Sequence, residues 1–303
     1  MINKTIVLTG ANGFLGSCLL TSLQKKYSTV IATSGHKNNN HTILEVNLLD
    51  FKKIKDAITH YKPDIVIHTG SLVDLSRDYT IGLNCIDNNI KGTLNLVEAL
   101  RTNPSKKIIF TSTEEVYGSG TVPFVETQTP QPPSLYSVSK LAAEHITSLY
   151  ASELNIALVI LRIATFYGPC QPPRRFIPQM IERALTNKDV LLNSGLKKRD
   201  YIYIEDVING ILLACETNLD NKFEIINIGG GKSYTLEYLA QQIVHAAKSS
   251  SKIVKNAFPD RIGEAQEWIL DISKAKKLLQ WKPKISLQQG VIEEVAYFKK
   301  LWT

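Results

Sequence analysis

The chain has 303 residues, of which 44% are hydrophobic and 21% charged, and its formal net charge is +7 at pH 7. This composition is typical of an ordinary folded protein and excludes a mainly disordered or low-complexity chain. No apolar run approaches the roughly 18–20 residues of a membrane-spanning helix, and the apolar start is too short for a signal peptide. We therefore expect a cytoplasmic protein with no membrane partner.

The basic residues, the cysteines and the histidines form no recognisable binding motif. Lysines are spread along the chain, which indicates a solvated surface or an anionic small-molecule substrate and no nucleic-acid partner. The four cysteines and six histidines show no CxxC, HxH or HExxH spacing. We expect reduced thiols and no metal site.

Strand-like and helix-like segments alternate over the first two thirds of the chain. Apolar and β-branched runs predict strands over Thr5–Thr9, Thr29–Thr33, Ile43–Val46, Ile65–His68, Lys107–Thr111 and Ala157–Arg162. Helical periodicity predicts helices between them, over Phe14–Lys26, Phe51–Tyr61, Ile81–Arg101 and Leu135–Leu154. Because the strands lack strict alternation, both of their faces should be covered, and this rhythm predicts an α/β fold with a doubly wound parallel sheet.

A second, smaller lobe is predicted after residue 165. The segment 167–173 holds three prolines, which continue neither a helix nor a central strand and so mark a connection. Helices are expected beyond it, over Ile177–Asn187, Ile204–Cys215, Leu236–Ala247, Ile272–Leu279 and Leu287–Lys300. We therefore predict a first domain over 1–165 and a mixed α/β lobe over 166–303, with an element near 203–228 returning to the first sheet.

The first predicted strand runs into a glycine-rich turn that opens a helix. Gly10 permits the tight turn, Gly13 lets the backbone approach a pyrophosphate, and Gly16 allows close packing of helix on strand. The amides at the helix start, around Phe14 and Leu15, would face the phosphates. The turn therefore predicts a Rossmann-type dinucleotide site.

A second motif, Tyr136-Ser-Val-Ser-Lys140, lies on a predicted helix. The i, i+4 spacing places the tyrosine and the lysine on one helix face. A lysine ammonium beside a phenol favours the phenolate and lowers a pKa that is ordinarily about 10. This pair indicates acid–base chemistry, because it follows the strand-like run Ile109–Thr113 in a chain that begins with a dinucleotide turn.

These motifs belong to an ordered series that resembles the extended short-chain dehydrogenases/reductases, in particular the NAD(P)-dependent nucleotide-sugar epimerase/dehydratase family. The resemblance runs from about Lys4 to Leu301. Its segments are TGANGFLG at 9–16, IHTG at 67–70, NNIKGTLNLVEA at 88–99, TSTEEVYG at 111–118, YSVSK at 136–140, LRIATFYGP at 161–169, RDYIYIEDV at 199–207, NIGGG at 227–231 and DISKAKKLLQWKP at 271–283.

The resemblance implies a role for each matching residue. The implied catalytic residues are Tyr136 as general acid/base, Lys140 as its partner, Thr113 as a donor to the sugar oxygen, and Glu115. The implied cofactor contacts are Gly10, Gly13, Phe14, Leu15, Gly16, Ser34, His36, Lys37, Asn47, Leu48, Gly70, Asn89, Tyr136 and Lys140. The implied substrate contacts are Thr165, Phe176, Arg199 and Arg261, with both arginines on the diphosphate. The family also implies a homodimer through a bundle of the helices Ile81–Arg101 and Leu135–Leu154.

Three positions depart from the family pattern. Ser34 replaces the acidic residue that binds a ribose 2′-hydroxyl, and His36 and Lys37 follow it, so NADP(H) is favoured over NAD(H). Asn47 stands where an adenine-contacting Asp often occurs. Thr165 replaces an asparagine that often touches the substrate. His68, at a strand end, is expected to be a hydrogen-bonded structural residue.

Hydride transfer between the nicotinamide and hexose C4 is the chemistry that the resemblance implies. The short chain and the NADP(H) preference favour a 4-ketoreductase acting on a nucleotide-activated 4-keto sugar. A 4-epimerase is the first alternative. A dehydratase or decarboxylase would use Glu115 as a second base, although the same segment also occurs in epimerases. A non-catalytic dinucleotide-binding sensor is disfavoured, because such proteins typically lose the tyrosine or the lysine.

Overall fold

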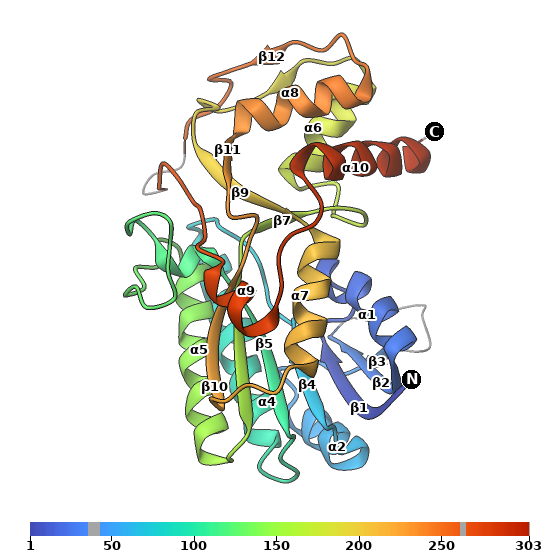
Figure 1. The fold of residues 1–303 in the computed structure, drawn as a ribbon, viewed down its shortest axis with the longest axis vertical. Helices are drawn as coiled ribbons and strands as arrows, with labels where there is room; N and C mark the ends of the chain where they lie inside the picture. Colours follow the sequence, from blue (N-terminus) through green and yellow to red (C-terminus); the bar gives the residue numbers. More distant parts are fainter. Residues whose placement is uncertain (36–42, 261–264, 303) are drawn as a thin grey trace. The chain divides into compact units, whose positions relative to one another are not determined.

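The computed structural model describes residues 1–35, 43–260 and 265–302, and the chain divides into two compact units. The first unit comprises Met1–Tyr117, Pro130–Arg162 and Gly210–Ile226. The second comprises Gly118–Thr129, Ile163–Asn209 and Asn227–Thr303. The chain therefore passes more than once between the units, and each is described below by itself (Figure 1).

A seven-stranded sheet forms the centre of the first unit, in the order β10-β6-β5-β4-β1-β2-β3 (Figure 1). Its strands are β1 (Ile2–Thr9), β2 (Tyr27–Ser34), β3 (Ile43–Glu45), β4 (Ile65–His68), β5 (Lys107–Thr113), β6 (Ala157–Ile163) and β10 (Phe223–Ile228). The pairs from β5 through β4, β1 and β2 to β3 are parallel. The predicted doubly wound parallel sheet is confirmed.

Both faces of this sheet are covered by apolar contacts, which explains why its strands lack alternation. Val66 of β4 packs in a cluster with Ile54, Leu96 and Ala143 from three different helices. Its neighbour Ile67 points to the other face and is also fully buried. Because successive strand residues point to opposite faces, each must be apolar when helices lie on both sides.

The helices of the first unit are α1 (Phe14–Lys26), α2 (Phe51–Tyr61), α3 (Tyr79–Cys85), α4 (Gly92–Ala99), α5 (Leu135–Glu153) and the end of α7 (Ile204–Glu216). Several of them, namely α2, α3 and α5, begin at residues whose side chains accept hydrogen bonds from free backbone amides. Asp50 caps α2 by accepting the Lys53 amide, and Ser134 and Ser137 form a capping box at the start of α5. Such caps stop a helix from unwinding at its first turn.

The helix expected over Ile81–Arg101 is present as uninterrupted helical turns over 79–99, but its middle is π-helical, which the sequence did not predict. The chain forms α3, then the π-helical segment η1 (Ile86–Lys91), then α4. A π-helical segment accommodates an extra residue within a helix, so apolar spacing on either side still looks helical and conceals it.

The second unit combines small sheets with helices, of which α6 (Phe176–Leu185), α8 (Leu236–Ala247) and α10 (Leu287–Trp302) pack together. A three-stranded sheet has the order β11-β9-β7, from β11 (Ser233–Thr235), β9 (Lys198–Tyr203) and β7 (Thr165–Tyr167), and β12 (Ile253–Val254) pairs with β8 (Val190–Leu191). A further helix is α9 (Ser273–Leu279). A core that includes Ile181, Ile243 and Val295 joins α6, α8 and α10, so this unit has a hydrophobic core of its own.

Among the described residues, no helix combines the length and the apolar character that crossing a membrane requires.

Candidate active site

The glycine turn after β1 is packed so tightly that larger residues do not fit. Gly10 has a φ of +72°, and a Cβ there would lie 2.6 Å from the Gly70 Cα. A Cβ on Gly16 would lie 2.1 Å from the Gly10 carbonyl oxygen. The Gly13 amide donates to that same oxygen at 2.9 Å. This close approach brings the start of α1 against the end of β1, which is the geometry that fits a dinucleotide pyrophosphate.

His68 fixes the ends of β1 and β4 next to this turn. Its Nδ1 lies 2.7 Å from the Thr9 hydroxyl and its Nε2 lies 3.0 Å from the Thr93 hydroxyl. Thr93 donates its own hydrogen to the Asn89 carbonyl, so His68 donates from Nε2 and accepts at Nδ1. Burial lowers the pKa of His68 to about 3. The ring is therefore neutral, and the expected hydrogen-bonded structural role is confirmed.

Tyr136 and Lys140 lie on α5 and are both buried. The Lys140 ammonium lies 4.3 Å from the centre of the Phe110 ring. Burial lowers the pKa of Lys140 to about 8, against the attraction of Glu144. A desolvated ammonium near a phenol is stabilised if the phenol ionises, so the pair suits transfer of a proton through the tyrosine oxygen.

Asn89 connects the π-helical segment to the helix that carries the tyrosine. Its amide nitrogen donates to the Leu72 carbonyl at 3.0 Å and to the Ser139 hydroxyl at 2.9 Å, and its oxygen accepts the Leu72 amide at 2.7 Å. Ser139 in turn donates to the Tyr136 carbonyl at 2.7 Å. The sequence reading missed Ser139, although its place inside the YSVSK segment was a signal.

A buried ion pair holds α5 against the sheet. The Arg162 guanidinium donates to Glu144 from Nε at 3.1 Å and from Nη2 at 2.7 Å, and each side chain is only 3% exposed. Ser112 of β5 also donates to Glu144, and Arg162 stacks over the Tyr117 ring at 4.8 Å. The network joins α5 to β5 and β6, so it fixes the helix that carries Tyr136. Residue spacing alone did not predict this network.

Thr113 and Glu115 lie at the end of β5 and in the short helix η2 (Glu114–Tyr117). The Thr113 hydroxyl accepts the Glu115 amide at 3.2 Å. The Glu115 carboxylate accepts the hydroxyl of Ser134, the N-cap of α5, at 2.6 Å. Glu115 thus supports the start of the helix that carries Tyr136, and a carboxylate is stabilised at a helix N-terminus.

The predicted adenosine-side residues lie at the ends of β2 and β3. The Ser34 carbonyl accepts the Val46 amide at 2.9 Å, and Asn47 accepts the Leu49 amide at 2.9 Å. Leu48 leaves no space at Gly70, where a Cβ would lie 2.8 Å from its side chain. Two further predicted residues, His36 and Lys37, lie outside the described residues.

In the second unit, Thr165 and Phe176 gather about Tyr201. Thr165 pairs with Tyr201 across β7 and β9, and the Phe176 ring lies 6.5 Å from the Tyr201 ring. Arg199, also on β9, lies with its guanidinium 5.3 Å from the Trp268 ring. The second predicted diphosphate arginine, Arg261, lies outside the described residues.

Asp200 holds the glycine segment after β10. Its carboxylate accepts the amides of Gly230 at 2.6 Å, Gly231 at 3.1 Å and Leu270 at 3.2 Å. Complete burial raises the pKa of Asp200 to about 7, although the three donors oppose this rise. Nothing in the residue spacing predicted this role for Asp200, which lies inside the segment RDYIYIEDV.

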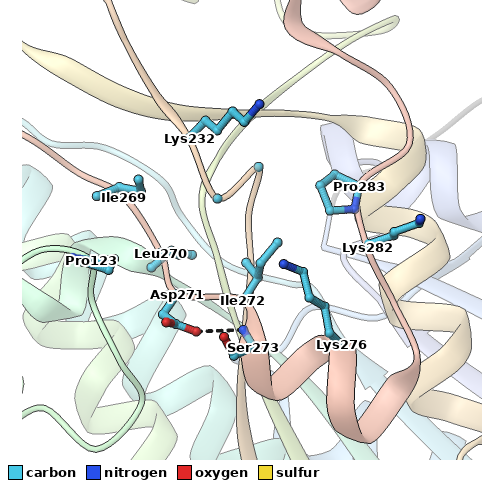
Figure 2. Close-up of a pocket in the computed structure, with 12 residues that line it drawn as sticks. Pro123, Lys232, Ile269, Leu270, Asp271, Ile272, Ser273, Lys276, Lys282 and Pro283 are labelled. Carbon is cyan, nitrogen blue, oxygen red and sulfur yellow. Dashed lines mark hydrogen bonds between the residues drawn. The ribbon is translucent and has the colours of Figure 1, made fainter.

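Beside this segment lies a surface pocket of about 380 Å³, formed within the second unit. Figure 2 shows Lys232, Lys276 and Lys282 around it, and Asp271 accepting the Ser273 amide at 2.7 Å. Of the predicted site residues that the structure describes, none lines this pocket.

Comparison with known proteins decides the family. Residues 6–229 match the sequence profile of the NAD dependent epimerase/dehydratase family. The chain belongs to this family. The predicted resemblance is confirmed, and the chain is an enzyme of a family that includes nucleotide-sugar epimerases, dehydratases and decarboxylases.

Relatives cover the chain over nearly its whole length. A UDP-N-acetyl-α-D-glucosaminuronate decarboxylase of Bacillus cytotoxicus is 28% identical and is aligned over 99% of both chains. UDP-glucose 4-epimerase from Thermotoga maritima, solved with UDP-glucose, has a TM-score of 0.91 at 30% identity, over 99% of this chain and 100% of that one.

A third relative is UDP-glucuronic acid 4-epimerase from Bacillus cereus, solved with UDP-glucuronic acid and NAD. It has a TM-score of 0.89 at 30% identity, over 98% of this chain and 99% of that one. Within the family, the comparisons therefore leave epimerase, dehydratase and decarboxylase activities as candidates, and they give NAD as the dinucleotide.

Proposed function

We propose that this enzyme is a NAD-dependent nucleotide-sugar 4-epimerase, which inverts hexose C4 through a transient 4-keto sugar. The observation that carries the choice is the hydrogen bond from Ser134 to Glu115. Elimination of water needs a second base for the carbon beside the ketone, and Glu115 is the candidate for it. A 4-epimerase needs only the tyrosine, which leaves Glu115 in its place at the start of α5.

Each candidate site residue of the first unit has a distinct task in this proposed reaction. The Tyr136 oxygen takes the proton of the sugar C4 hydroxyl and later returns it, and the Lys140 ammonium stabilises the phenolate between these steps. The Thr113 hydroxyl accepts the Glu115 amide, and in this proposal it donates its own hydrogen to the same sugar oxygen. Bound NAD supplies the acceptor for the C4 hydrogen, and the turn from Gly10 to Gly16 holds its pyrophosphate.

The substrate we propose is a UDP-linked hexose, held through its diphosphate by Arg199 and Arg261. Both epimerases cited above were solved with UDP-sugars. A guanidinium suits a diphosphate because its forked donors match two oxygens at once.

This proposal replaces the 4-ketoreductase favoured by the sequence. That expectation depended on a preference for NADP(H), read from Ser34, His36 and Lys37, and the relatives give it no support. Since Ser34 carries no charge to repel a 2′-phosphate, we expect NADP⁺, like NAD⁺, to bind. Ser34→Asp should weaken the binding of NADP⁺ more than the binding of NAD⁺. Titration of both dinucleotides measures this.

The test of the proposed function is turnover of single UDP-sugars by the purified protein. UDP-glucose, UDP-glucuronic acid and UDP-N-acetylglucosamine are each incubated with NAD⁺, and products are identified by mass and NMR. A 4-epimerase gives a product of equal mass and reaches the same equilibrium from either epimer. A product lighter by water or by carbon dioxide would instead identify a dehydratase or a decarboxylase, and absence of turnover would contradict the proposed substrates.

We also infer a homodimer through the helices α3, α4 and α5 and the segment η1. Large apolar side chains are exposed along them: Leu83, Ile86, Leu94, Leu135, Val138 and Leu149. Exposed large apolar side chains that concentrate on neighbouring helices are typical of an interface with a partner. Light scattering that found a monomer at micromolar concentration would contradict the inference, and Leu149→Glu should shift a dimer towards monomer.

A further inference from the structure

Trp268 lies beneath the guanidinium of Arg199 in the second unit. The guanidinium carbon is 5.3 Å from the centre of the indole, and the indole packs edge-on against Phe124 at 5.6 Å. The Trp268 side chain is only 3% exposed. A buried aromatic surface therefore supports a cation that itself remains partly exposed.

The backbone fixes the indole beside β9. The Lys198 amide donates to the Gln266 carbonyl at 2.9 Å, and the Trp268 amide donates to the Lys198 carbonyl at 3.1 Å. Glu267, between Gln266 and Trp268, thus forms a single parallel bridge with Lys198 of β9. Since Arg199 directly follows Lys198, this bridge places Trp268 close to the Arg199 side chain.

The indole nitrogen of Trp268 is poorly suited to a purely structural role. Nε1 is buried and has no hydrogen-bond partner among the described residues. Trp281, the other fully buried tryptophan of this unit, donates its Nε1 to the Asp206 carbonyl at 3.0 Å. A buried donor without a partner is unfavourable, so phenylalanine at position 268 would fill most of the same space without that cost. Stability alone does not account for the residue.

We propose that Trp268 is a positioning residue that orients Arg199 for the diphosphate of the substrate. The indole contacts the flat face of the guanidinium. The N–H donors of the guanidinium lie in its own plane and point away from the ring, which is the direction from which a guanidinium binds an anion. One of them, Nη1, donates to the Lys198 carbonyl at 3.0 Å, which fixes the rotation of the plane. The inference rests on the proposed function, because it takes the ligand of Arg199 to be a nucleoside diphosphate.

The experiment compares Trp268→Leu, which removes the π face, with Trp268→Phe, which keeps a smaller one. We expect KM for the UDP-sugar, and Kd for UDP by calorimetry, to rise roughly tenfold in Trp268→Leu. In Trp268→Phe both should rise about threefold, and kcat should stay within about twofold in each variant. Equal KM in wild type and in both variants would overturn the proposal.

An Arg199→Ala background separates positioning from packing. If Trp268 acts through the arginine, Trp268→Phe and Trp268→Leu should change Kd for UDP no further in that background. An undiminished effect there would overturn the proposal. If Trp268→Leu does not fold, Trp268→Phe alone decides the same comparison.

Trp281→Phe is the matched control, since it changes a buried tryptophan of the same unit. It should lower the melting temperature more than Trp268→Phe does, because it removes a satisfied hydrogen bond, and it should leave KM unchanged. A rise in KM equal to that of Trp268→Phe would reduce the effect to general loosening of the unit and overturn the proposal.

The UDP titration keeps this inference distinct from the proposed function. UDP binding without turnover of any UDP-sugar would overturn the 4-epimerase and still test Trp268. Turnover with KM insensitive to Trp268 would overturn the inference alone. Failure of the wild type to bind UDP would overturn both.

Discussion

The two units hold their candidate site residues by different means. In the first unit, the helix that carries Tyr136 is held by buried polar networks, one through Asn89 and Ser139 and one between Glu144 and Arg162. In the second, Arg199 rests on an aromatic ring, and Phe176 is 41% exposed. Buried networks hold a side chain through directed hydrogen bonds, whereas a ring supports a guanidinium by its face. Under the proposed function, Tyr136 in the first unit would carry out the proton transfer and Arg199 in the second would bind the sugar nucleotide.

The largest expected effect tests this division directly. Tyr136→Phe should lower kcat by about 10²–10⁴-fold, because the oxygen that carries the proton is lost. NAD⁺ and UDP should bind as in wild type, by titration. Arg199→Ala should do the reverse, with weaker UDP binding and a smaller loss of kcat. If Tyr136→Phe and Arg199→Ala lowered kcat and the affinity for UDP to a similar extent, the different roles of the two units would be contradicted.

Breaking the buried ion pair should reduce stability. Glu144→Gln leaves the Arg162 guanidinium buried without its counter-charge, which costs about 3–5 kcal/mol. Urea unfolding measures the change in the free energy of unfolding. Glu153→Gln on the same helix is the control, since its pair with Arg101 lies at the surface and should contribute little. Equal effects would mean that the buried network does not hold α5.

The histidine network should make the protein sensitive to acid. The pKa of His68 is lowered to about 3 in the folded protein and is about 6.5 in an unfolded chain. The stability that this neutral ring contributes is complete above pH 6.5 and is lost as the pH falls towards 3, by about 2–3 kcal/mol at pH 4.5. The free energy of unfolding of His68→Asn, from urea titrations, should be lower than that of wild type at pH 7. It should also change less with pH. Parallel curves would exclude His68 as the cause.

The smallest expected effect concerns Glu115. Glu115→Gln keeps an oxygen for the Ser134 hydroxyl and removes the base, so a 4-epimerase should lose less than about tenfold in kcat/KM, or roughly 1.4 kcal/mol. An eliminating enzyme should lose far more and should incorporate deuterium from heavy water at sugar C5. That label in the wild-type product would show that Glu115 belongs to the chemistry.

Residues close in sequence were predicted well. The bounds of α1 and α2 agree with the periodicity, because both helices have one apolar face and clear ends. The glycine turn was predicted because each glycine has a local steric reason. The π-helical segment was missed, since an inserted residue leaves the apolar spacing on either side intact.

Residues that meet only in the folded protein were not predictable. Glu144 and Arg162 are 18 positions apart and lie on different elements. Asp200 meets the amide of Leu270, 70 positions later. Trp268 reaches Arg199 only because its segment pairs with β9. A buried polar residue needs a partner, but a single sequence does not show which distant residue that partner is.

The path of the chain through the first unit has a consequence for synthesis on the ribosome. Gly210–Ile226 belongs to this unit, and β10 completes the sheet beside β6. A nascent chain that ends before residue 223 therefore displays β6 as an edge, and its residues Leu158–Leu161 are entirely apolar. Such edges pair with other chains, so a fragment cut at residue 165 should aggregate, and a cut after residue 228 is the earliest that retains the whole sheet.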